Sequence, residues 1–202
     1  MSKDDIMQIK IVLEGITPKI WRRFQVSNKL TFHQLHNVIQ AVMGWTNSHL
    51  YSFIVDDKEY QDDRYDPLER GLLSSRKQKI GVLQAKQKFI YTYDFGDNWE
   101  HLLVVEKLLS KDASAAHPFC IEGERNCPPE DSGSVPGYYR LMTVRKNKKH
   151  PEYEELIKGW LGEDYDPERF SAQEINIELR RLFPKKGKKK PDGRARYWVL
   201  NK

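Results

Sequence analysis

The segment Y-T-Y-D-F-G-D-N-W-E-H, residues 91–101, gathers side chains that could do chemistry. Asp94 and Asp97 flank a Phe-Gly pair, and His101 closes the segment. Carboxylate and imidazole groups together can hold a divalent metal ion or transfer protons. Alternate residues of a strand face opposite sides, so the acids of one regular strand cannot all converge. A structural alternative is that the Asp side chains accept backbone N–H bonds within a turn.

Further polar groups lie elsewhere in the chain. Glu130 and Asp131 follow two prolines and could add carboxylate oxygens if their loop meets the first segment. His36 lies on a predicted helix, and His49 comes shortly after it. Together with residues 91–101, these groups would form a polar pocket suited to metal-assisted hydrolysis or phosphoryl chemistry. Without such a pocket, the chain is interpreted as a non-catalytic binding or accessory protein.

The triplet Asp94-Phe95-Gly96 also occurs in the magnesium loop of protein kinases. A kinase needs a Gly-rich phosphate loop, a strand Lys and a His-Arg-Asp loop before this triplet, and the chain has none of them. The chain also lacks a G-x-x-x-x-G-K-[ST] phosphate loop, and residues 91–101 contain no G-x-S-x-G elbow. These absences exclude the kinase and P-loop classes.

Three residues offer ligands for a zinc ion: His117, Cys120 and Cys127. A structural zinc site needs four ligands and commonly uses more closely spaced Cys pairs. One of the other histidines would have to complete the site through the fold. The alternatives are buried free thiols or a disulfide that closes a short loop.

Two adjacent arginines, Arg22 and Arg23, lie in a predicted strand, so they face opposite sides of it. An Arg side chain near Trp45 or Trp99 could bind a phosphate or carboxylate ligand. The structural alternative is a brace, an ion pair between this strand and an aspartate of residues 91–101. The fit of Arg to buried ion pairs favours the brace.

Strands and helices are predicted in a segregated order. Residues 31–34, T-F-H-Q, fit a helical capping box, and Gly44 suits the end of that helix. Asp94–Asn98 is the predicted turn of a β-hairpin around residues 88–108, because Gly96 can adopt a positive φ. The predicted strands are 6–13, 19–26, 50–55, 58–60, 88–93 and 99–108. A loop is predicted at 117–137. The further helices are predicted at 138–145, 151–160 and 171–183. This order predicts a single α+β domain, an antiparallel sheet with helices packed on it and a helical C-terminal part.

The composition is typical of a soluble globular protein. Of the 202 residues, 39% are hydrophobic and 31% are charged. No apolar run approaches the roughly eighteen residues of a transmembrane helix. The N-terminus has no signal-peptide core, and two cysteines do not make a secreted disulfide scaffold. We therefore expect a cytoplasmic protein that does not contact membranes.

The net charge of +5 is concentrated in the basic C-terminal tail, residues 184–202. Residues 184–196 carry seven Lys or Arg and one Asp, so the rest of the chain is close to neutral. Such a tail can attract a nucleic-acid backbone by releasing counterions. The alternative is a solvated end that aids solubility. The candidate nucleic-acid contacts are Lys185, Lys186, Lys188, Lys189, Lys190, Arg194 and Arg196.

A series of short motifs runs in order from about residue 18 to residue 183. They are P-K-I-W-R-R at 18–23, L-H-N-V-I-Q-A-V-M-G-W at 35–45, H-L-Y-S-F at 49–53, Y-T-Y-D-F-G-D-N-W-E-H at 91–101, C-I-E-G-E-R-N-C-P-P-E-D at 120–131, G-Y-Y at 137–139, H-P-E at 150–152 and D-P-E-R-F at 166–170. In order and number they resemble the plasmid pRiA4b ORF-3-like family. Two departures are the single Gly133, where the family has paired glycines, and Ser171, where it has Asp.

The resemblance implies one family domain at residues 1–183, followed by the basic tail at 184–202. It also implies an association with plasmids and mobile elements, since some relatives are labelled passenger or resolvase-like proteins. Some relatives carry an added metal-binding tail motif, which this chain lacks. The resemblance implies no settled activity. The leading interpretation is a non-catalytic binding or accessory protein that contacts nucleic acid through its tail, and an enzyme with a carboxylate and histidine pocket is the alternative.

Overall fold

The computed structural model describes residues 5–64, 71–110 and 118–184. Some predicted site residues lie outside these described residues: His117, Lys185, Lys186, Lys188, Lys189, Lys190, Arg194 and Arg196.

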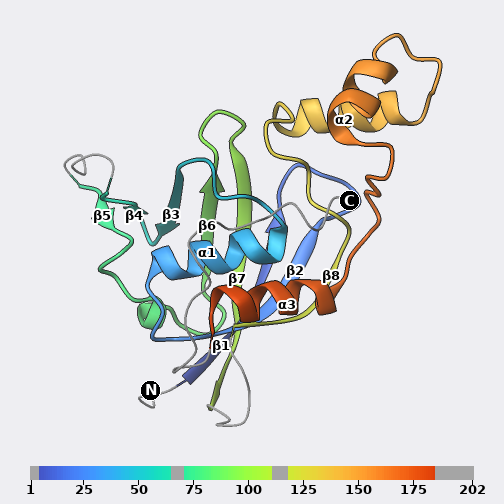
Figure 1. The fold of residues 1–202 in the computed structure, drawn as a ribbon. Coiled ribbons are helices and arrows are strands. Elements are labelled where there is room, and N and C mark those ends of the chain that lie inside the picture. The colour runs from blue at the N-terminus through green and yellow to red at the C-terminus, as the bar shows by residue number, and fades with distance from the viewer. Residues whose placement is uncertain (1–4, 65–70, 111–117, 185–202) are drawn as a thin grey trace.

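An eight-stranded sheet forms the centre of the fold (Figure 1). The spatial order of its strands is β5-β4-β3-β6-β7-β1-β2-β8, and the described pairs are antiparallel except β4 with β5. The strands are β1 Asp5–Leu13, β2 Trp21–Ser27, β3 Tyr51–Val55, β4 Lys58–Gln61, β5 Leu73–Ser74, β6 Lys88–Tyr93, β7 Trp99–Ser110 and β8 Phe119–Glu124. With the helices packed on this sheet, the predicted single α+β domain is confirmed.

The alternation seen in the sequence of β1 arises because one face of the sheet is buried. Met7, Ile9 and Ile11 are fully buried, whereas Gln8 and Lys10 between them are partly exposed. Burying one such apolar side chain contributes about 1.5–3 kcal/mol. A one-residue slip would turn this whole set towards solvent, so the alternation fixes the register of the strand.

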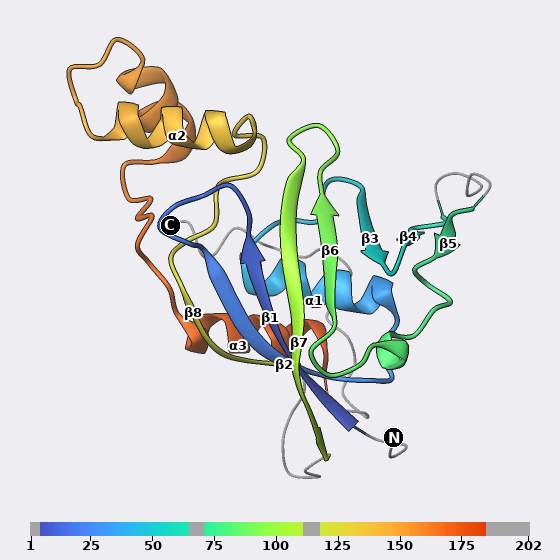
Figure 2. The same cartoon turned by 180° about the vertical axis from the view of Figure 1, so that it is seen from behind.

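Helices α1 (Phe32–Met43) and α3 (Ala172–Leu182) lie on the same face of the sheet (Figures 1 and 2). The predicted capping box of α1 is confirmed: Thr31 Oγ1 accepts from Gln34 N at 3.2 Å, and Gln34 Oε1 accepts from Thr31 N at 2.9 Å. Gly44 ends the helix with a φ of 91°. A short 3-10 turn, η1 (Ile80–Val82), lies between β5 and β6 in the chain.

Two further helical segments lie beyond one end of the sheet (Figure 1). They are α2 (Ser134–Arg145) and the π-helical η2 (Tyr153–Leu161), and they share a small core of Val144, Tyr153 and Ile157. The chain then returns to the sheet and forms α3, whose N-cap Ser171 accepts from Glu174 N at 3.2 Å.

The predicted loop at 117–137 is wrong in two places. Residues 119–124 form the edge strand β8, and α2 begins at Ser134 rather than at Tyr138. In β8 only Cys120 is buried and the pairing with β2 shifts register, so the strand shows no apolar alternation. The sequence predicted a loop at the start of α2. Gly133 and Ser134 there do adopt the positive φ values typical of turns, but the helix begins at Ser134.

The outer edge of β8 is closed by one side chain of α3. Asn176 Oδ1 accepts a hydrogen bond from Cys120 N at 2.7 Å, and Asn176 Nδ2 donates to Cys120 O at 2.8 Å. The amide therefore pairs with both backbone groups of one strand residue. This contact fixes α3 to the edge of the sheet.

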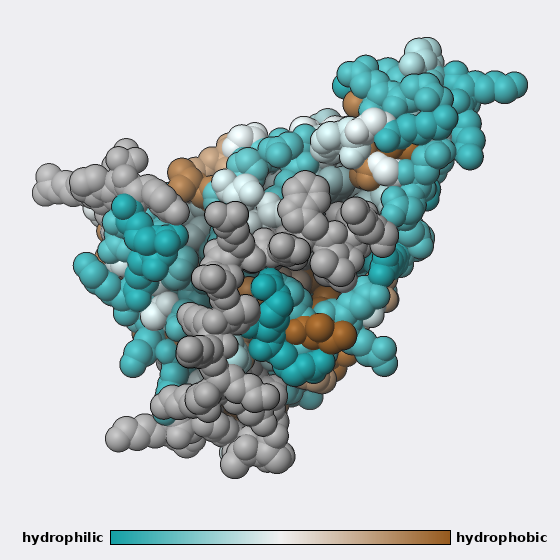
Figure 3. All heavy atoms as spheres, viewed as in Figure 1, coloured by the Kyte–Doolittle hydropathy of each residue, from teal (hydrophilic) through white to brown (hydrophobic). Residues whose placement is uncertain are grey.

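The face that carries α1 and α3 is mostly hydrophilic outside the grey residues, with hydrophobic residues in small patches (Figure 3). Among the described residues, no helix is both long enough and apolar enough to cross a membrane.

Candidate metal centre

The turn between β6 and β7 folds around Asp94. This residue adopts a φ of 57°, and its Oδ1 accepts a hydrogen bond from Gly96 N at 2.9 Å. Its backbone N–H donates to Leu50 O at 2.9 Å. Oδ1 thus accepts a backbone N–H bond within the turn, as the structural alternative predicted for the Asp side chains. Oδ2 faces a second partner.

That partner is His49, which also faces Asp131. The His49 Nε2 atom lies 3.6 Å from Asp94 Oδ2 and 3.2 Å from Asp131 Oδ1. All three ligand atoms lie within 4.8 Å of one another. Over the described parts of the chain, no other group of three His, Cys, Asp or Glu side chains converges in this way.

The spacing of these atoms fits a divalent transition-metal ion. Ligand atoms of a tetrahedral zinc ion lie about 3.4 Å apart, because each bond is about 2.1 Å long. The His49 Nε2 atom is buried and makes no hydrogen bond to the described residues, although it faces two carboxylates. One nitrogen and two carboxylate oxygens suit zinc or manganese, and three protein ligands leave coordination positions open.

A cavity of about 520 Å³ adjoins the centre. His49 and Asp94 line it, and so do Asp62 and Arg64 from the segment after β4. Burial alone would raise the pKa of Asp62, but hydrogen bonds from Arg76 and Arg64 outweigh this effect and hold the pKa below its usual value. The cavity is therefore lined by charged groups that are already ordered.

His36 forms the inner wall of this cavity. Its Nδ1 lies 2.8 Å from the Tyr91 hydroxyl, and its Nε2 lies 2.6 Å from Asn47 Oδ1. Because the Tyr91 hydroxyl also accepts from Gln40 Nε2, it donates to Nδ1, and Nε2–H donates to Asn47. Burial lowers the pKa of His36 to about 3. The ring is therefore neutral and positions Asn47.

His101 lies in the core instead of the cavity. It is fully buried, its Nδ1 lies 3.2 Å from Tyr91 O, and its ring meets Trp45 edge-on at 5.2 Å. Burial lowers its pKa to about 3. Trp99 is buried beside it, 6.3 Å from Trp45 between ring centres. Trp99 and His101 are thus packing groups, whereas Phe95 at the hairpin turn is 45% exposed.

Glu130 and Asp97 hold the second loop against the hairpin. Glu130 accepts hydrogen bonds from the Tyr93 hydroxyl and from both the backbone N and the hydroxyl of Thr46. Asp97 Oδ2 accepts from Gly133 N at 3.0 Å. These contacts flank Asp131 and set its position beside His49.

The predicted Arg–Asp brace is wrong. Arg23 pairs with Glu106 at 2.6 Å and with Glu122. Arg22 faces the other side of the strand, is buried, and donates to backbone carbonyls, including Val42 O at 2.8 Å. Arg23 does reach across β1 to the hairpin, but its partner there is Glu106 within strand β7, whereas Asp94 and Asp97 lie in the turn before that strand.

Both cysteines are free and buried, which agrees with the free-thiol alternative and not with the disulfide alternative. Cys127 Sγ lies 3.6 Å from Arg22 NH2, and Cys120 Sγ lies 3.9 Å from Glu122 O. Burial raises the pKa of each thiol to about 11. Within the described residues neither thiol joins a metal-ligating group.

Sequence reasoning missed the polar residues Asn47, Asp62 and Arg64 that line the cavity. The only signal was the charged trio Asp62-Asp63-Arg64, which stands in a stretch without periodicity. Of the predicted set, the structure brings together His49, Asp94 and Asp131. It places Asp97, Glu130 and His101 in supporting contacts.

Residues 5–174 match the family described as Plasmid pRiA4b ORF-3-like protein. The chain belongs to this family. It is 32% identical over 191 residues to "Uncharacterized protein y4hQ" of Sinorhizobium fredii (strain NBRC 101917 / NGR234), covering 91% of this chain and 95% of that one. The crystal structure of "Protein of Unknown Function MM3350 from Methanosarcina mazei Go1" is similar with a TM-score of 0.78 and 37% identity, over 85% of this chain and 98% of that one. The names of these two relatives state no activity, so the roles of individual residues are inferred from the geometry of the site.

Proposed function

We propose that this pRiA4b ORF-3-like protein binds a divalent transition-metal ion through His49, Asp94 and Asp131 and uses it to hydrolyse a small anionic substrate in the adjoining cavity. The observation that carries the proposal is the convergence of three ligand atoms from separate segments within 4.8 Å. Each segment belongs to a different family motif, at 49–53, 91–101 and 120–131.

The arrangement suits hydrolysis better than structural metal binding. Structural zinc sites use four protein ligands, whereas catalytic sites keep a position for water. A bound ion would lower the pKa of that water and polarise the substrate. Arg64 at the cavity wall adds a positive charge that favours an anionic substrate, although it also pairs with Asp62 at 2.9 Å.

Metal binding is tested on the full chain after treatment with a chelator. We expect isothermal titration with Zn²⁺ or Mn²⁺ to show one site per chain. His49→Ala and Asp94→Asn should weaken binding at least about tenfold, because each removes a ligand or its charge. Glu100→Gln is the matched control, since Glu100 is a nearby exposed acid outside the cluster. Equal affinity of wild type and His49→Ala would refute the centre.

Hydrolysis is tested separately with p-nitrophenyl phosphate, which is anionic, and with p-nitrophenyl acetate, a neutral ester that should be turned over more slowly. We expect turnover by the metal-loaded protein and a loss of turnover in Asp94→Asn. A protein that binds metal at this site but turns over neither ester would be a non-catalytic metal-binding protein, which overturns the hydrolytic half of the proposal.

A second candidate function rests on the sequence of the basic tail. The concentration of positive charge in residues 184–196 favours an accessory protein that contacts nucleic acid. We expect the full chain to bind duplex DNA with an affinity that falls as salt rises, and the chain without residues 185–202 to bind much more weakly. Equal binding by both chains, or none by either, would refute this role.

A further inference from the structure

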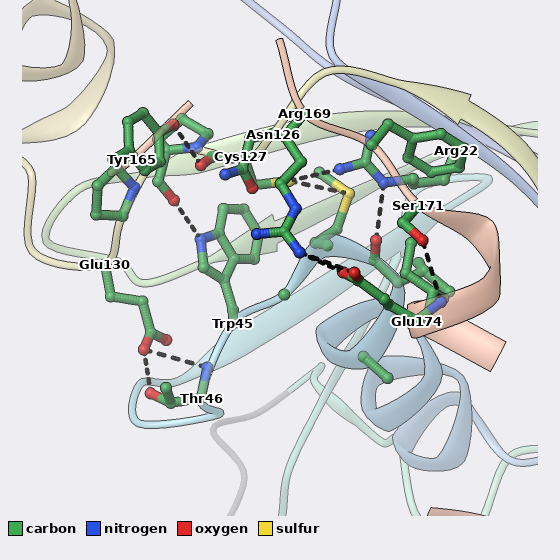
Figure 4. A pocket seen from close by; sticks show the side chains of 18 of the residues that line it. Arg22, Trp45, Thr46, Asn126, Cys127, Glu130, Tyr165, Arg169, Ser171 and Glu174 are labelled. Carbon is green, nitrogen blue, oxygen red and sulfur yellow. Dashed lines mark hydrogen bonds and ion pairs between the residues drawn. The ribbon is translucent and has the colours of Figure 1, made fainter. Parts of the chain in front are cut away.

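Figure 4 shows a second cavity, which has a volume of about 430 Å³. It is enclosed by the end of α1, the loop at 126–130, the end of η2 and the start of α3. Its size falls within the roughly 300–1,000 Å³ of small-molecule sites. None of the three proposed metal ligands lines it, so it can be considered on its own.

The buried charge in this cavity is Arg22, which is 3% exposed. Its Nε donates to Val42 O, and NH1 donates to Trp21 O and Glu124 O, each at 2.8 Å. Its NH2 reaches only the Cys127 thiol, at 3.6 Å, a weak acceptor. No acidic side chain pairs with Arg22 among the described residues. A buried charge without a counter-ion is costly, so this guanidinium is suited to an added anion.

The acidic groups of the lining are already engaged. Glu174 pairs with Arg169 at 2.8 Å and 2.9 Å, as Figure 4 shows. Glu130, at the Thr46 end of the lining, accepts hydrogen bonds from the hydroxyls of Tyr93 and Thr46, which are neutral donors and leave its charge without a cation among the described residues. The lining therefore leaves one positive charge, that of Arg22, without an acidic partner.

The rest of the lining is largely apolar and aromatic. Trp45 is fixed there by its Nε1–H, which donates to Pro128 O at 2.9 Å. The Phe170 ring centre lies 5.0 Å from the Arg22 guanidinium carbon. Trp160 at the rim is 46% exposed although it is large and apolar. The first turn of α3, which has partial positive charge, also faces the cavity through Ser171.

We propose that this cavity binds a small organic carboxylate, with the carboxylate on Arg22 and an aromatic or branched apolar body against Trp45, Phe170 and Trp160. The ligand oxygen takes the place of the weak thiol contact at NH2. A phosphate ester fits less well, because it brings a second negative charge and the lining offers a single uncompensated cation. The site shares no ligand with the proposed metal centre, although Glu130, which lines it, precedes the metal ligand Asp131.

The test uses the full chain and three probes of increasing length: benzoate, phenylacetate and 4-phenylbutyrate. Each is paired with its neutral amide. We expect saturable quenching of tryptophan fluorescence by at least one acid. The affinity for the corresponding amide should be at least about tenfold lower, because the amide cannot form the charge-assisted hydrogen bond. Equal affinity of acid and amide, or no saturable binding of any acid at millimolar concentration, would overturn the proposal.

Two variants at the rim test the location without disturbing the core. Trp160→Ala should weaken the binding of both the acid and the amide, that of the acid several-fold, because it removes part of the apolar wall. Phe95→Ala is the matched control, since Phe95 is an aromatic with a similar exposure of 45% that does not line this cavity. Arg22→Lys, provided it folds, should reduce the preference for acid over amide. Unchanged binding in Trp160→Ala would place the ligand elsewhere.

Discussion

Three histidines of the described residues, His33, His36 and His101, each hold at least one ring nitrogen within hydrogen-bond distance of a protein oxygen, although His101 Nε2 is buried without a partner. His36 bonds to Tyr91 and Asn47, His101 lies against Tyr91 O, and His33 lies 2.8 Å from the Tyr51 hydroxyl. Burial lowers the pKa of His33 to about 4, and that of His36 and His101 to about 3. These side chains are neutral structural groups at neutral pH.

This burial makes stability depend on pH. The pKa of His36 and of His101 is lower in the folded state than the usual value near 6.5, so the unfolded chain binds more protons as pH falls. The stabilisation is complete above pH ~6.5 and is lost progressively towards pH ~3. Between pH ~7 and pH ~5 we expect each histidine to lower the free energy of unfolding by about 2 kcal/mol. Urea denaturation measures it.

A control isolates one proton of that effect. His101→Phe keeps an aromatic ring in the core and removes one titrating group. Between pH ~7 and pH ~5 its unfolding free energy should fall by about 2 kcal/mol less than that of the wild type. An unchanged slope would contradict the assignment to His101.

At the residue scale, the sequence predicted most of the candidate groups but not their grouping. Asp94, Asp131 and His49 were all named in advance, yet so were Asp97, Glu130 and His101, which have supporting roles. Asp94 and Asp131 adopt positive φ values of 57° and 58°, whereas the sequence predicted the turn at 94–98 with its positive φ at Gly96. The direction of each side chain depends on those turns.

At the scale of elements, the hairpin β6–β7 and the loop after β8 act as one unit through Tyr93. Its hydroxyl donates to Glu130 and accepts from Ser48 N at 3.0 Å and His49 N at 3.4 Å. One side chain thus links the strand, the segment carrying His49 and the loop carrying Asp131.

We therefore expect Tyr93→Phe to weaken metal binding although Tyr93 is no ligand. Loss of the hydroxyl leaves the Glu130 carboxylate and two backbone N–H groups short of a partner, which costs about 1–3 kcal/mol of stability. Metal affinity should fall about tenfold or more, as for other groups that orient ligands. Titration calorimetry and thermal unfolding measure the two effects.

Tyr60→Phe is the control, because Tyr60 is buried in β4, outside these contacts. It should leave metal affinity unchanged. A Tyr93→Phe protein that binds metal as tightly as the Tyr60→Phe protein would contradict the coupling.

Elements with a strong local signal were predicted well. The capping box placed α1, and apolar alternation placed β1, β2, β6 and β7 to within a few residues. The sequence did not predict β8, because an edge strand with one buried residue shows no alternation of apolar and polar side chains. The order of strands in the sheet was not predicted, since it depends on long-range pairing, such as that of β1 with both β2 and β7.

At the scale of the whole molecule, we propose that the folded domain ends near residue 183, where the core ends. Leu179 is fully buried and Ile175 is 7% exposed, and both lie on α3. Leu182 and Phe183 pack on the same core. The family match itself ends at residue 174, within this helix.

Two truncations test that boundary. A chain that ends at Pro184 should unfold cooperatively at nearly the same temperature as the full chain. A chain that ends at Ser171 loses α3 and the burial of Ile175 and Leu179, about 1.5–3 kcal/mol for each side chain, which is a large part of a typical total of about 5–15 kcal/mol. We expect it to unfold at a much lower temperature. Calorimetry distinguishes the two, and a poorly folded 1–184 chain would contradict the boundary.

The contact of Asn176 with Cys120 has a consequence for assembly. An open strand edge is a template on which a second chain can add a strand, and repeated addition gives fibrils. Here the side-chain amide occupies the place that an incoming backbone would take. The opposite edge, β5, is two residues long and offers little to extend. At Cys120, therefore, an added strand would have to displace the amide of Asn176, and this makes strand addition at the β8 edge less favourable.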